Sequence, residues 1–418
     1  MVEVPPRSVD EPTVLITLTG PDRPGVSAAL FGALGTTRAR VIDVEQVVVR
    51  GHLTLAVLLA TGGEAVERLE GPAVALASSL GMSVTVRTGR GDNATRPSGR
   101  LHVTVLASPL LPATVAAVAD RIAAEGANID RIRRLSRWPV TTVELDVSGG
   151  DVGALRAALA GVAVQHAVDI AVAPAGLVRR GRRLVVMDVD STLIQDEVIE
   201  LLAAHAGRAA EVADVTARAM AGELDFTQSL HERVACLAGL PVEVLARTRD
   251  AVRLTPGART LVRTLTRLGF TVALVSGGFA EVVEPLAERL GIRLTRANRL
   301  EVEDGRLTGR VLGDVVDRAG KADALRQFAL DEGLPLSRTI AVGDGANDVD
   351  MLVAAGLGIA FNAKPLVRAQ ADTSVTVPYL DSVLYLLGIP RQEIEEADAE
   401  DGITQHGHAV TWSEPLPR

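Results

Sequence analysis

Aromatic residues and cysteine are both scarce in this sequence. Phe, Trp and Tyr together make up 2% of the 418 residues, which argues against a protein that stacks single-stranded nucleic-acid bases on aromatic rings. The net charge of −9 points the same way, because phosphate backbones bind to basic surfaces. The single cysteine, Cys236, excludes an intrachain disulfide framework and is typical of a packing residue in a reducing cytoplasm.

Lysine is nearly absent as well. Only Lys321 and Lys364 occur among the 43 basic residues, and all the others are arginine. A GC-rich genome accounts for the arginines, but it does not explain why two positions kept lysine. Each of the two lysines therefore needs a local reason.

Long hydrophobic runs are absent too. The most apolar stretch, residues 101–119, contains His102, Pro109 and Pro112, so it predicts a strand, a turn and a helix rather than a membrane span. Residues 1–12 are acidic and proline-rich, without the basic start and apolar run of a secretory signal. We expect a cytoplasmic protein that binds neither membrane nor nucleic acid.

The first 175 residues contain an internal repeat. When the sequence is shifted by 87 positions, residues 14–19 align with 101–106, and Ile42-Asp43 aligns with Ile129-Asp130. Each copy predicts the order β-α-β-β-α-β of a ferredoxin-like unit. The expected strands are 14–19, 44–49, 53–59 and 83–87 in the first copy, and 101–106, 131–135, 141–147 and 168–172 in the second. We expect two domains, 1–91 and 100–175, joined by a linker rich in Gly, Asn, Ser and Pro.

The turn after the first predicted strand has the sequence Gly20-Pro-Asp-Arg-Pro-Gly25. Free backbone amides at the start of a helix suit a carboxylate, although Gly and Pro also serve tight turns for backbone reasons alone. With this turn, the first half resembles a tandem pair of ACT domains, which are small-molecule sensor modules. The resemblance implies a homodimer and an amino-acid effector, such as L-serine, at Gly20, Asp22, Arg23 and Gly25. The second copy departs from the pattern, because its equivalent segment, 107–112, has no glycine.

Beyond a second linker at 173–181, predicted strands alternate with predicted helices. Such alternation indicates a parallel sheet with helices on both faces. The strands are expected at 184–187, 271–275 and 339–342, and the helices at 195–239, 257–268 and 281–290.

Three further segments complete the expected domain, which spans 182–390. The insert 196–253 is too long for a simple crossover and predicts a helical lid. Residues 299–312, centred on Asp304-Gly305, predict a hairpin. The acidic segment 391–418 predicts a mobile tail, in which His406-Gly-His408 is an incidental motif.

Carboxylates gather where two of these strands end. Asp188 and Asp190 follow the first strand two positions apart, so they point to the same side, at the end where parallel sheets bind ligands. A helix cap would use one carboxylate, whereas two on one face repel each other unless a cation lies between them. Asp344 and Asp348 follow another strand and could flank the same point, which gives the oxygen ligands that Mg²⁺ prefers.

Groups suited to phosphate occur nearby in the expected fold. Ser276-Gly-Gly278 ends the intervening strand, where a hydroxyl and bare glycine amides form a phosphate cradle, or alone a flexible turn. Lys321 stands at the expected start of a helix, where a compact charge would fit and a planar guanidinium would not. Lys364, in Asn362-Ala-Lys-Pro365, is assigned a structural role.

Together these elements resemble the haloacid-dehalogenase superfamily of phosphatases over about residues 183–379. The resemblance implies that Asp188 is the nucleophile and that Asp190 is the proton donor and later the base. It implies Mg²⁺ held by Asp188, the backbone carbonyl of Asp190 and Asp344, with Asp348 supporting these ligands. It also implies that the phosphoryl oxygens are bound by Ser276, the amide of Gly277, Lys321 and Asn347.

Motifs in the lid narrow the substrate. Asp196-Glu-Val-Ile-Glu200, the segment 219–230 and Arg233 are similar to those of the phosphoserine phosphatases within that superfamily. This resemblance implies that Glu197 binds the amino group of the substrate and Arg233 its carboxylate, while Met220 and Phe226 exclude water. The alternatives are a solvated helix face for the charged pair and ordinary lid packing for Met220 and Phe226.

The expected reaction is hydrolysis of O-phospho-L-serine to L-serine and phosphate through an aspartyl-phosphate, the last step of L-serine biosynthesis. Two alternatives stay open. A phosphatase for another small phosphomonoester would keep the catalytic residues but use Glu197 and Arg233 differently. A ligand-sensing regulator would rely on the ACT-like half, but an inert phosphatase half has no physical reason to keep clustered, mutually repelling carboxylates.

Overall fold

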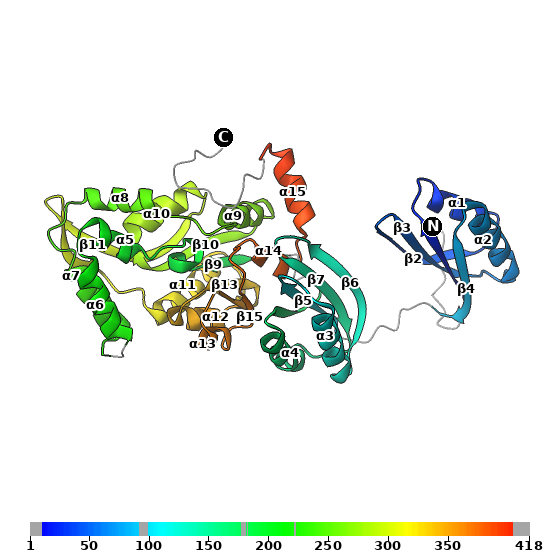
Figure 1. Cartoon of the computed structure of the whole chain (residues 1–418), viewed down its shortest axis with the longest axis horizontal. Coiled ribbons are helices and arrows are strands. Elements are labelled where there is room, and N and C mark those ends of the chain that lie inside the picture. Colours follow the sequence, from blue (N-terminus) through cyan, green and yellow to red (C-terminus); the bar gives the residue numbers. More distant parts are fainter. Residues whose placement is uncertain (1–10, 92–98, 177–180, 182, 221–222, 404–418) are drawn as a thin grey trace. The chain divides into compact units, whose positions relative to one another are not determined.

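The computed structural model describes residues 11–91, 99–176, 181, 183–220 and 223–403 (Figure 1). The chain divides into two compact units, Met1–Pro97 and Ser98–Arg418. Within the described ranges, no helix combines the length and the apolar character needed to cross a membrane.

The first unit is a four-stranded antiparallel sheet with two helices packed on it. The strand order is β2-β3-β1-β4. Alternate residues of β1 (Val14, Ile16 and Leu18) are fully buried with the helices, because side chains alternate across a strand. The elements are β1 (Pro12–Pro21), α1 (Val26–Leu34), β2 (Arg40–Val49), β3 (His52–Ala60), α2 (Glu67–Leu80) and β4 (Ser83–Arg90).

The second unit begins with the same arrangement. Its first sheet has the strand order β6-β7-β5-β8, which matches the first unit position by position. The predicted doubling of a ferredoxin-like unit is therefore confirmed. The elements are β5 (Leu101–Ala107), α3 (Pro112–Ala124), β6 (Asn128–Ser136), β7 (Thr141–Ser148), α4 (Val152–His166) and β8 (Asp169–Pro174).

An α/β domain follows in the same unit. Its seven-stranded sheet has the order β12-β11-β10-β9-β13-β14-β15 and is parallel except for β12. All four residues of the central strand β9 are buried, and separate apolar clusters cover the two faces of the sheet. The strands are β9 (Leu184–Met187), β10 (Thr271–Phe279), β11 (Leu294–Glu303), β12 (Arg306–Leu312), β13 (Thr339–Gly343), β14 (Leu357–Phe361) and β15 (Thr373–Val375).

Helices fill both layers of this domain and form the insert between β9 and β10. The predicted insert contains four helices: α5 (Val198–His205), α6 (Ala209–Met220), α7 (Phe226–Ala235) and α8 (Glu243–Ala251). The remaining helices are α9 (Ala258–Arg267), α10 (Ala280–Arg289), α11 (Arg318–Asp331), α12 (Val349–Ala354), α13 (Pro365–Arg368), α14 (Ser382–Leu386) and α15 (Arg391–Glu400). The predicted hairpin is present as β11 and β12, with Asp304 and Gly305 at positive φ in its two-residue turn.

A polar seam joins the second ferredoxin-like unit to the α/β domain, because β8 lies beside β15. Asp169 is 1% exposed, and its carboxylate accepts hydrogen bonds from Ser374 Oγ at 2.6 Å and from N and Oγ1 of Thr376 at 2.8 and 2.9 Å. Thr373 Oγ1 donates to the carbonyl of Ile170 at 3.1 Å. Since β15 is the last strand of its sheet, the seam covers an edge that would otherwise be open.

The two parts also share an apolar core. Leu106, Leu135, Val140 and Ala171 of the ferredoxin-like unit belong to the same buried cluster as the α/β domain. The repeat predicted over 100–175 therefore lies in the same compact unit as the α/β domain.

The C-terminal segment differs from its prediction. Residues 391–400 form helix α15, in which Ile394 and Asp398 are 3% and 1% exposed. Asp398 accepts hydrogen bonds from Arg263 and Arg267 of α9, at separations of up to 135 positions in the chain. The expectation of a mobile tail is therefore wrong for 391–400, because partners remote in sequence hold this acidic helix. His406 and His408 lie outside the described residues.

Replacing Asp169 by Ala removes three hydrogen bonds from the buried seam. We expect the second unit to lose about 2 kcal/mol of stability, since donors that faced a carboxylate lose their acceptor. A thermal scan of the full chain measures this as a melting temperature lowered by a few degrees. Asp323→Ala, which removes an exposed ion pair with Arg326, is the control and should change stability by less than about 0.5 kcal/mol. Equal shifts for both variants would contradict the prediction.

Candidate active site

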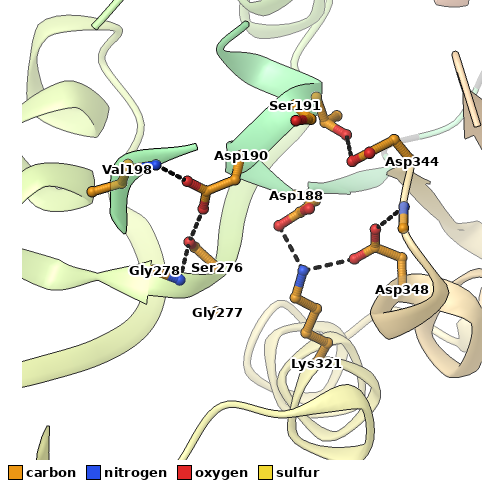
Figure 2. A network of polar contacts seen from close by, with 12 residues as sticks. Asp188, Asp190, Ser191, Val198, Ser276, Gly277, Gly278, Lys321, Asp344 and Asp348 are labelled. Carbon is orange, nitrogen blue, oxygen red and sulfur yellow. Dashed lines mark hydrogen bonds and ion pairs between the residues drawn. The ribbon is translucent and has the colours of Figure 1, made fainter. Parts of the chain in front are cut away.

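The site begins where β9 ends. Asp188 leaves the strand in extended conformation, and its N–H donates to the carbonyl of Val342 on β13 at 2.9 Å. Ser191 then adopts a left-handed conformation with φ of 56°, which is uncommon outside glycine and turns the chain sharply. Asp188 and Asp190 are thereby held at the carboxyl edge of the sheet, as their spacing predicts (Figure 2).

Lys321 joins two carboxylates in the interior. Its Nζ donates to Asp188 Oδ1 at 2.6 Å and to Asp348 Oδ1 at 2.7 Å (Figure 2). Lys321 and Asp348 are fully buried, and Asp348 Oδ2 also accepts from Gly345 N at 2.9 Å. Burial works against the charged lysine, but the two carboxylates outweigh it and raise the pKa of Lys321 above its usual value. The ammonium is therefore a permanent positive charge beside Asp188.

The pKa of Asp188 is raised, whereas a simple ion pair with a lysine would lower the pKa of a carboxyl group. Burial raises it well above the ordinary range, and the charge of Asp348 raises it further, although Lys321 opposes both effects. The single ammonium of Lys321 therefore does not offset burial and the repulsion from the neighbouring carboxylates. A cation that enters would stabilise the ionised form of Asp188.

The residues that follow β10 contact Asp190. Ser276 is fully buried, and its hydroxyl donates to Asp190 Oδ2 at 2.9 Å while accepting from Gly278 N at 2.8 Å. A Cβ at Gly278 would lie 2.9 Å from Asp190 Oδ2, and one at Gly277 would lie 3.0 Å from the ring of Phe226. Two glycines are therefore required here for close packing. Ser276 reaches the site through Asp190 and is not itself part of the cavity wall.

Asp190 is held by the lid as well. Its Oδ1 accepts from Val198 N at 2.7 Å, at the start of α5. Burial raises the pKa of Asp190, and the hydrogen bonds from Val198 and Ser276 oppose this rise. A raised carboxyl pKa favours the protonated form, which is the form that donates a proton.

Three carboxylates converge on one point suited to a metal ion. Oxygens of Asp188, Asp344 and Asp348 all lie within 4.8 Å of one another. Asp344 also accepts from Thr192 Oγ1 at 3.0 Å, and burial followed by the charge of Asp348 raises its pKa to about 6. The donor set fits a hard divalent cation, since it consists of carboxylate oxygens with an excess of negative charge.

One cavity of about 380 Å³ contains most of the predicted residues. Its lining has four acidic and two basic side chains, so acidic groups outnumber basic ones. The predicted residues on its wall are Asp188, Asp190, Glu197, Phe226, Arg233, Gly277, Lys321, Asp344 and Asn347. Ser276 and Asp348 lie behind this wall and act on it through Asp190 and Lys321.

The lid contributes a carboxylate and a guanidinium to this cavity. Glu197 Oε1 accepts from Ser191 Oγ at 2.7 Å, and partial burial, followed by the charge of Asp190, raises the pKa of Glu197 to about 7. Arg233 is half-buried on α7, where its Nε donates to the carbonyl of Ser229 at 3.3 Å, and burial lowers its pKa. In the described part of the chain no ion pair joins Glu197 to Arg233. Both charges thus face the same cavity and are available to a ligand with charges of both signs.

Other predicted residues lie elsewhere or cannot be placed. Met220 ends α6, but its side chain is outside the described part of the structure. Lys364 is exposed at the start of α13, and Cys236 packs against the core while its Sγ donates to the carbonyl of Glu232. Cys236 therefore packs as predicted, whereas the structural role of Lys364 stays a prediction.

The predicted effector turn belongs to the first unit. Gly20 is still part of β1, and a Cβ there would lie 2.6 Å from Met82 Cγ, so this glycine has a packing reason. Gly25, with φ of 94°, precedes α1, and the N–H of Asp22 is bonded to the carbonyl of Gly51. The turn therefore has backbone reasons for its glycines, and ligand binding by it stays a prediction.

Two functional neighbours were not predicted. Ser191 orients Glu197, and Thr192 orients Asp344. Their signal in the sequence is their position directly after Asp188-Val-Asp190, where a hydroxyl next to paired carboxylates is expected to serve one of them. The partner of Thr192 lies 152 positions away, so the sequence did not identify it, whereas Glu197 follows Ser191 by six positions.

The fold and this cavity together define a class. A parallel sheet, a helical insert after its central strand, paired aspartates, a buried lysine and an acidic loop are those of a haloacid dehalogenase-like hydrolase, whose profile matches residues 185–353. ACT-domain profiles match residues 12–87 and 100–173.

Comparison with individual proteins narrows the class. A phosphoserine phosphatase of Streptomyces coelicolor is 58% identical over 94% of this chain and 96% of its own length. A phosphoserine phosphatase of Mycobacterium tuberculosis is 51% identical over 93% and 96%. The crystal structure of a probable phosphoserine phosphatase from Vibrio cholerae, at 35% identity, superposes with a TM-score of 0.54 and covers 72% of this chain and 88% of that one. The chain belongs to the phosphoserine phosphatase family.

Asp188→Asn replaces one oxygen by nitrogen and removes the negative charge that the predicted attack of Asp188 on phosphorus requires. We expect phosphatase activity to fall by roughly 10³-fold or more. Because burial already disfavours the charge of Asp188, and Lys321 keeps Asp348 as its partner, the melting temperature should change by only a few degrees. Phosphate release and a thermal scan measure the two effects. Asp323→Asn, on the exposed face of α11, is the matched control. Substantial turnover by Asp188→Asn would exclude Asp188 as the nucleophile.

Proposed function

We propose that this chain hydrolyses O-phospho-L-serine to L-serine and phosphate, the last step of L-serine biosynthesis. The observation that supports it best is the single cavity in which Asp188 and Lys321 lie at one end and Glu197 and Arg233 at the lid. One end suits a phosphoryl group and the other suits the two charges of an amino acid. The family to which the chain belongs supports the same substrate.

The reaction proceeds in two displacements. An oxygen of Asp188 attacks phosphorus while the bond from phosphorus to the serine oxygen breaks, and Asp190 gives its proton to that oxygen. An aspartyl-phosphate and L-serine result. Asp190 then takes a proton from a water molecule that attacks phosphorus, the bond to Asp188 breaks, and phosphate leaves with both aspartates restored.

The phosphoryl oxygens need positive groups as negative charge shifts toward the leaving oxygen. Lys321, the amide of Gly277 and the side chain of Asn347 lie at this part of the cavity. Ser276 completes the set when its hydroxyl turns from Asp190 to the phosphoryl group. Lys321 and the amide of Gly277 are preformed donors, and such donors stabilise the transition state without reorganising at the moment of reaction.

A magnesium ion fits the acidic end of the cavity. Asp188, the backbone carbonyl of Asp190 and Asp344 would hold it, with Asp348 fixing Lys321 and the loop behind them. When bound, it supplies positive charge that offsets the repulsion between carboxylate and phosphate. The donor chemistry supports this ion, since carboxylates and carbonyls suit Mg²⁺ better than they suit softer metals.

The lid reads the amino-acid part of the substrate. Glu197 pairs with the ammonium group and Arg233 with the carboxylate, and charge-assisted bonds of this kind are the stronger ones. Phe226 packs over Gly277 and separates the phosphoryl group from bulk water.

The proposals on regulation and assembly rest on the ACT domains in the first half of the chain. The turn at Gly20, Asp22, Arg23 and Gly25 is the proposed binding site for an amino-acid effector such as L-serine, and the chain is proposed to form a homodimer. A cytoplasmic location agrees with its single, unpaired cysteine.

Turnover of a panel of phosphorylated metabolites, with and without Mg²⁺, tests the proposed function. We expect the highest kcat/KM for phosphoserine, no activity after chelation, recovery on adding Mg²⁺, and lower turnover with added L-serine. A preference for another phosphomonoester would replace the substrate but leave the catalytic assignment. No phosphate release from any member would favour a purely ligand-sensing protein.

Arg233→Ala tests the recognition of the substrate carboxylate. Loss of a charge-assisted bond should lower kcat/KM for phosphoserine by roughly 10- to 100-fold. O-phosphoethanolamine has no carboxylate, so its kcat/KM should stay within about twofold of the wild-type value. Arg247→Ala, an exposed arginine of α8 in the same lid, is the control. If Arg233→Ala hydrolyses phosphoserine as well as the wild type, the assignment is wrong.

A further inference from the structure

A buried asparagine lies behind the phosphate end of the cavity and has no role in the steps above. Asn298 of β11 is 1% exposed. Its Nδ2 donates to the carbonyl of Gly277 at 2.8 Å, and its Oδ1 accepts from Val316 N at 2.8 Å. Asn298 therefore bonds two segments that supply opposite sides of the phosphate site. It does not line the cavity and cannot touch the substrate directly.

On one side, Asn298 replaces missing strand pairing. β10 and β11 pair regularly up to Val275 and Arg296, and pairing resumes between Phe279 and Asn298. Three residues of β10 therefore bulge out opposite a single residue of β11. This bulge contains Ser276 and Gly277, and the side chain of Asn298 provides the bond that the ladder no longer makes.

The Gly277–Gly278 peptide is consequently held at both ends. Its carbonyl accepts from Asn298. Its N–H donates to Ser276 Oγ, which in turn donates to Asp190 (Figure 2). Because a trans peptide is planar, bonds on its two sides fix the orientation of the whole group. The amide of Gly277 belongs to the adjoining peptide, which shares the Gly277 Cα with this group, so its position depends on these bonds as well.

On the other side, Asn298 anchors the start of the lysine helix. Val316 directly precedes Asp317, whose carboxylate caps α11 by accepting from Gly320 N at 2.8 Å. Lys321 lies in the first turn of this helix, with its N–H bonded to the Asp317 carbonyl at 2.9 Å. A shift of Val316 would therefore move the ammonium relative to Gly277.

We propose that Asn298 is a positioning residue that sets the separation between the Gly277 amide and the Lys321 ammonium, and so tunes binding of the phosphoryl group in the transition state. This inference rests on the proposed function. Both groups must contact the same phosphoryl oxygens, and neither the loop nor the helix alone determines their spacing. Among the described residues, Asn298 is the one whose side chain bonds both to the Gly277 loop and to Val316 before α11.

Asn298→Asp tests the bond to Gly277 selectively. The variant keeps an oxygen that accepts from Val316 N. It replaces Nδ2, which donates to the Gly277 carbonyl, by a second oxygen. We expect kcat for phosphoserine to fall by about 10- to 100-fold and inhibition by inorganic phosphate to weaken by about tenfold. Inhibition by L-serine should stay within twofold, because Glu197, Arg233 and the proposed effector turn at 20–25 are all untouched. Asn298→Ala removes both bonds without adding a charge and should lower kcat at least as much. It replaces Asn298→Asp as the test variant if the aspartate variant does not fold.

Asp398→Asn is the control for a merely structural role. Asp398 is equally buried and also joins two segments, α9 and α15, away from the cavity. It should lower the melting temperature and leave kcat and phosphate inhibition unchanged. Asn298 variants that behave in this same way, or that weaken L-serine and phosphate inhibition equally, would overturn the proposal.

The wild type run in parallel separates this proposal from the proposed function. Absence of phosphoserine turnover by the wild type would overturn the function. The Asn298 variants would then be compared with the wild type on the phosphomonoester with the greatest turnover in the panel. The same two changes, a lower kcat and weaker inhibition by phosphate, would support the proposal, and their absence would overturn it.

Discussion

The active site depends on one buried ammonium held between two carboxylates. Lys321 contacts Asp188 and Asp348, and neither the lysine nor Asp348 reaches solvent. A single buried charge would be costly, and two adjacent carboxylates would repel each other, so each group is stable only because the others are present. A compact ammonium can sit between two carboxylates, whereas a guanidinium would need a planar, forked arrangement. This explains a lysine in a chain that otherwise uses arginine.

The sheet brings these groups together because its central strands end at the same edge. β9 delivers Asp188, β10 delivers the Ser276 loop, and β13 delivers the loop with Asp344 and Asp348. The helical insert then closes the cavity with charges of both signs. At the far edge of the same sheet the second ferredoxin-like unit covers β15 through Asp169, so the catalytic sheet and this unit share one buried framework.

Much of this could be predicted because the signals are local. Paired aspartates two positions apart, a glycine-rich strand end and alternating apolar runs each depend on neighbouring residues, and they predicted the parallel sheet, the repeat and most of the cavity lining. The differences are equally informative. The acidic segment 391–418 is predicted to be mobile, but residues 391–400 form a helix in which Asp398 is bound by arginines of α9. The role of Ser276 at the phosphate stays a prediction, and the bond from its hydroxyl to Asp190 was not predicted.

Local patterns in the sequence were sufficient to predict the class of elements, the order of the strands along the chain and the identity of the charged groups. They were sufficient because periodicity, turn chemistry and motif spacing act within about ten residues of the chain. Which of these groups are partners depends on the tertiary fold. Lys321 meets Asp188 across 133 positions, and Asn298 joins the Gly277 loop to the start of α11. Such pairings depend on packing between distant segments, and no local pattern specifies them.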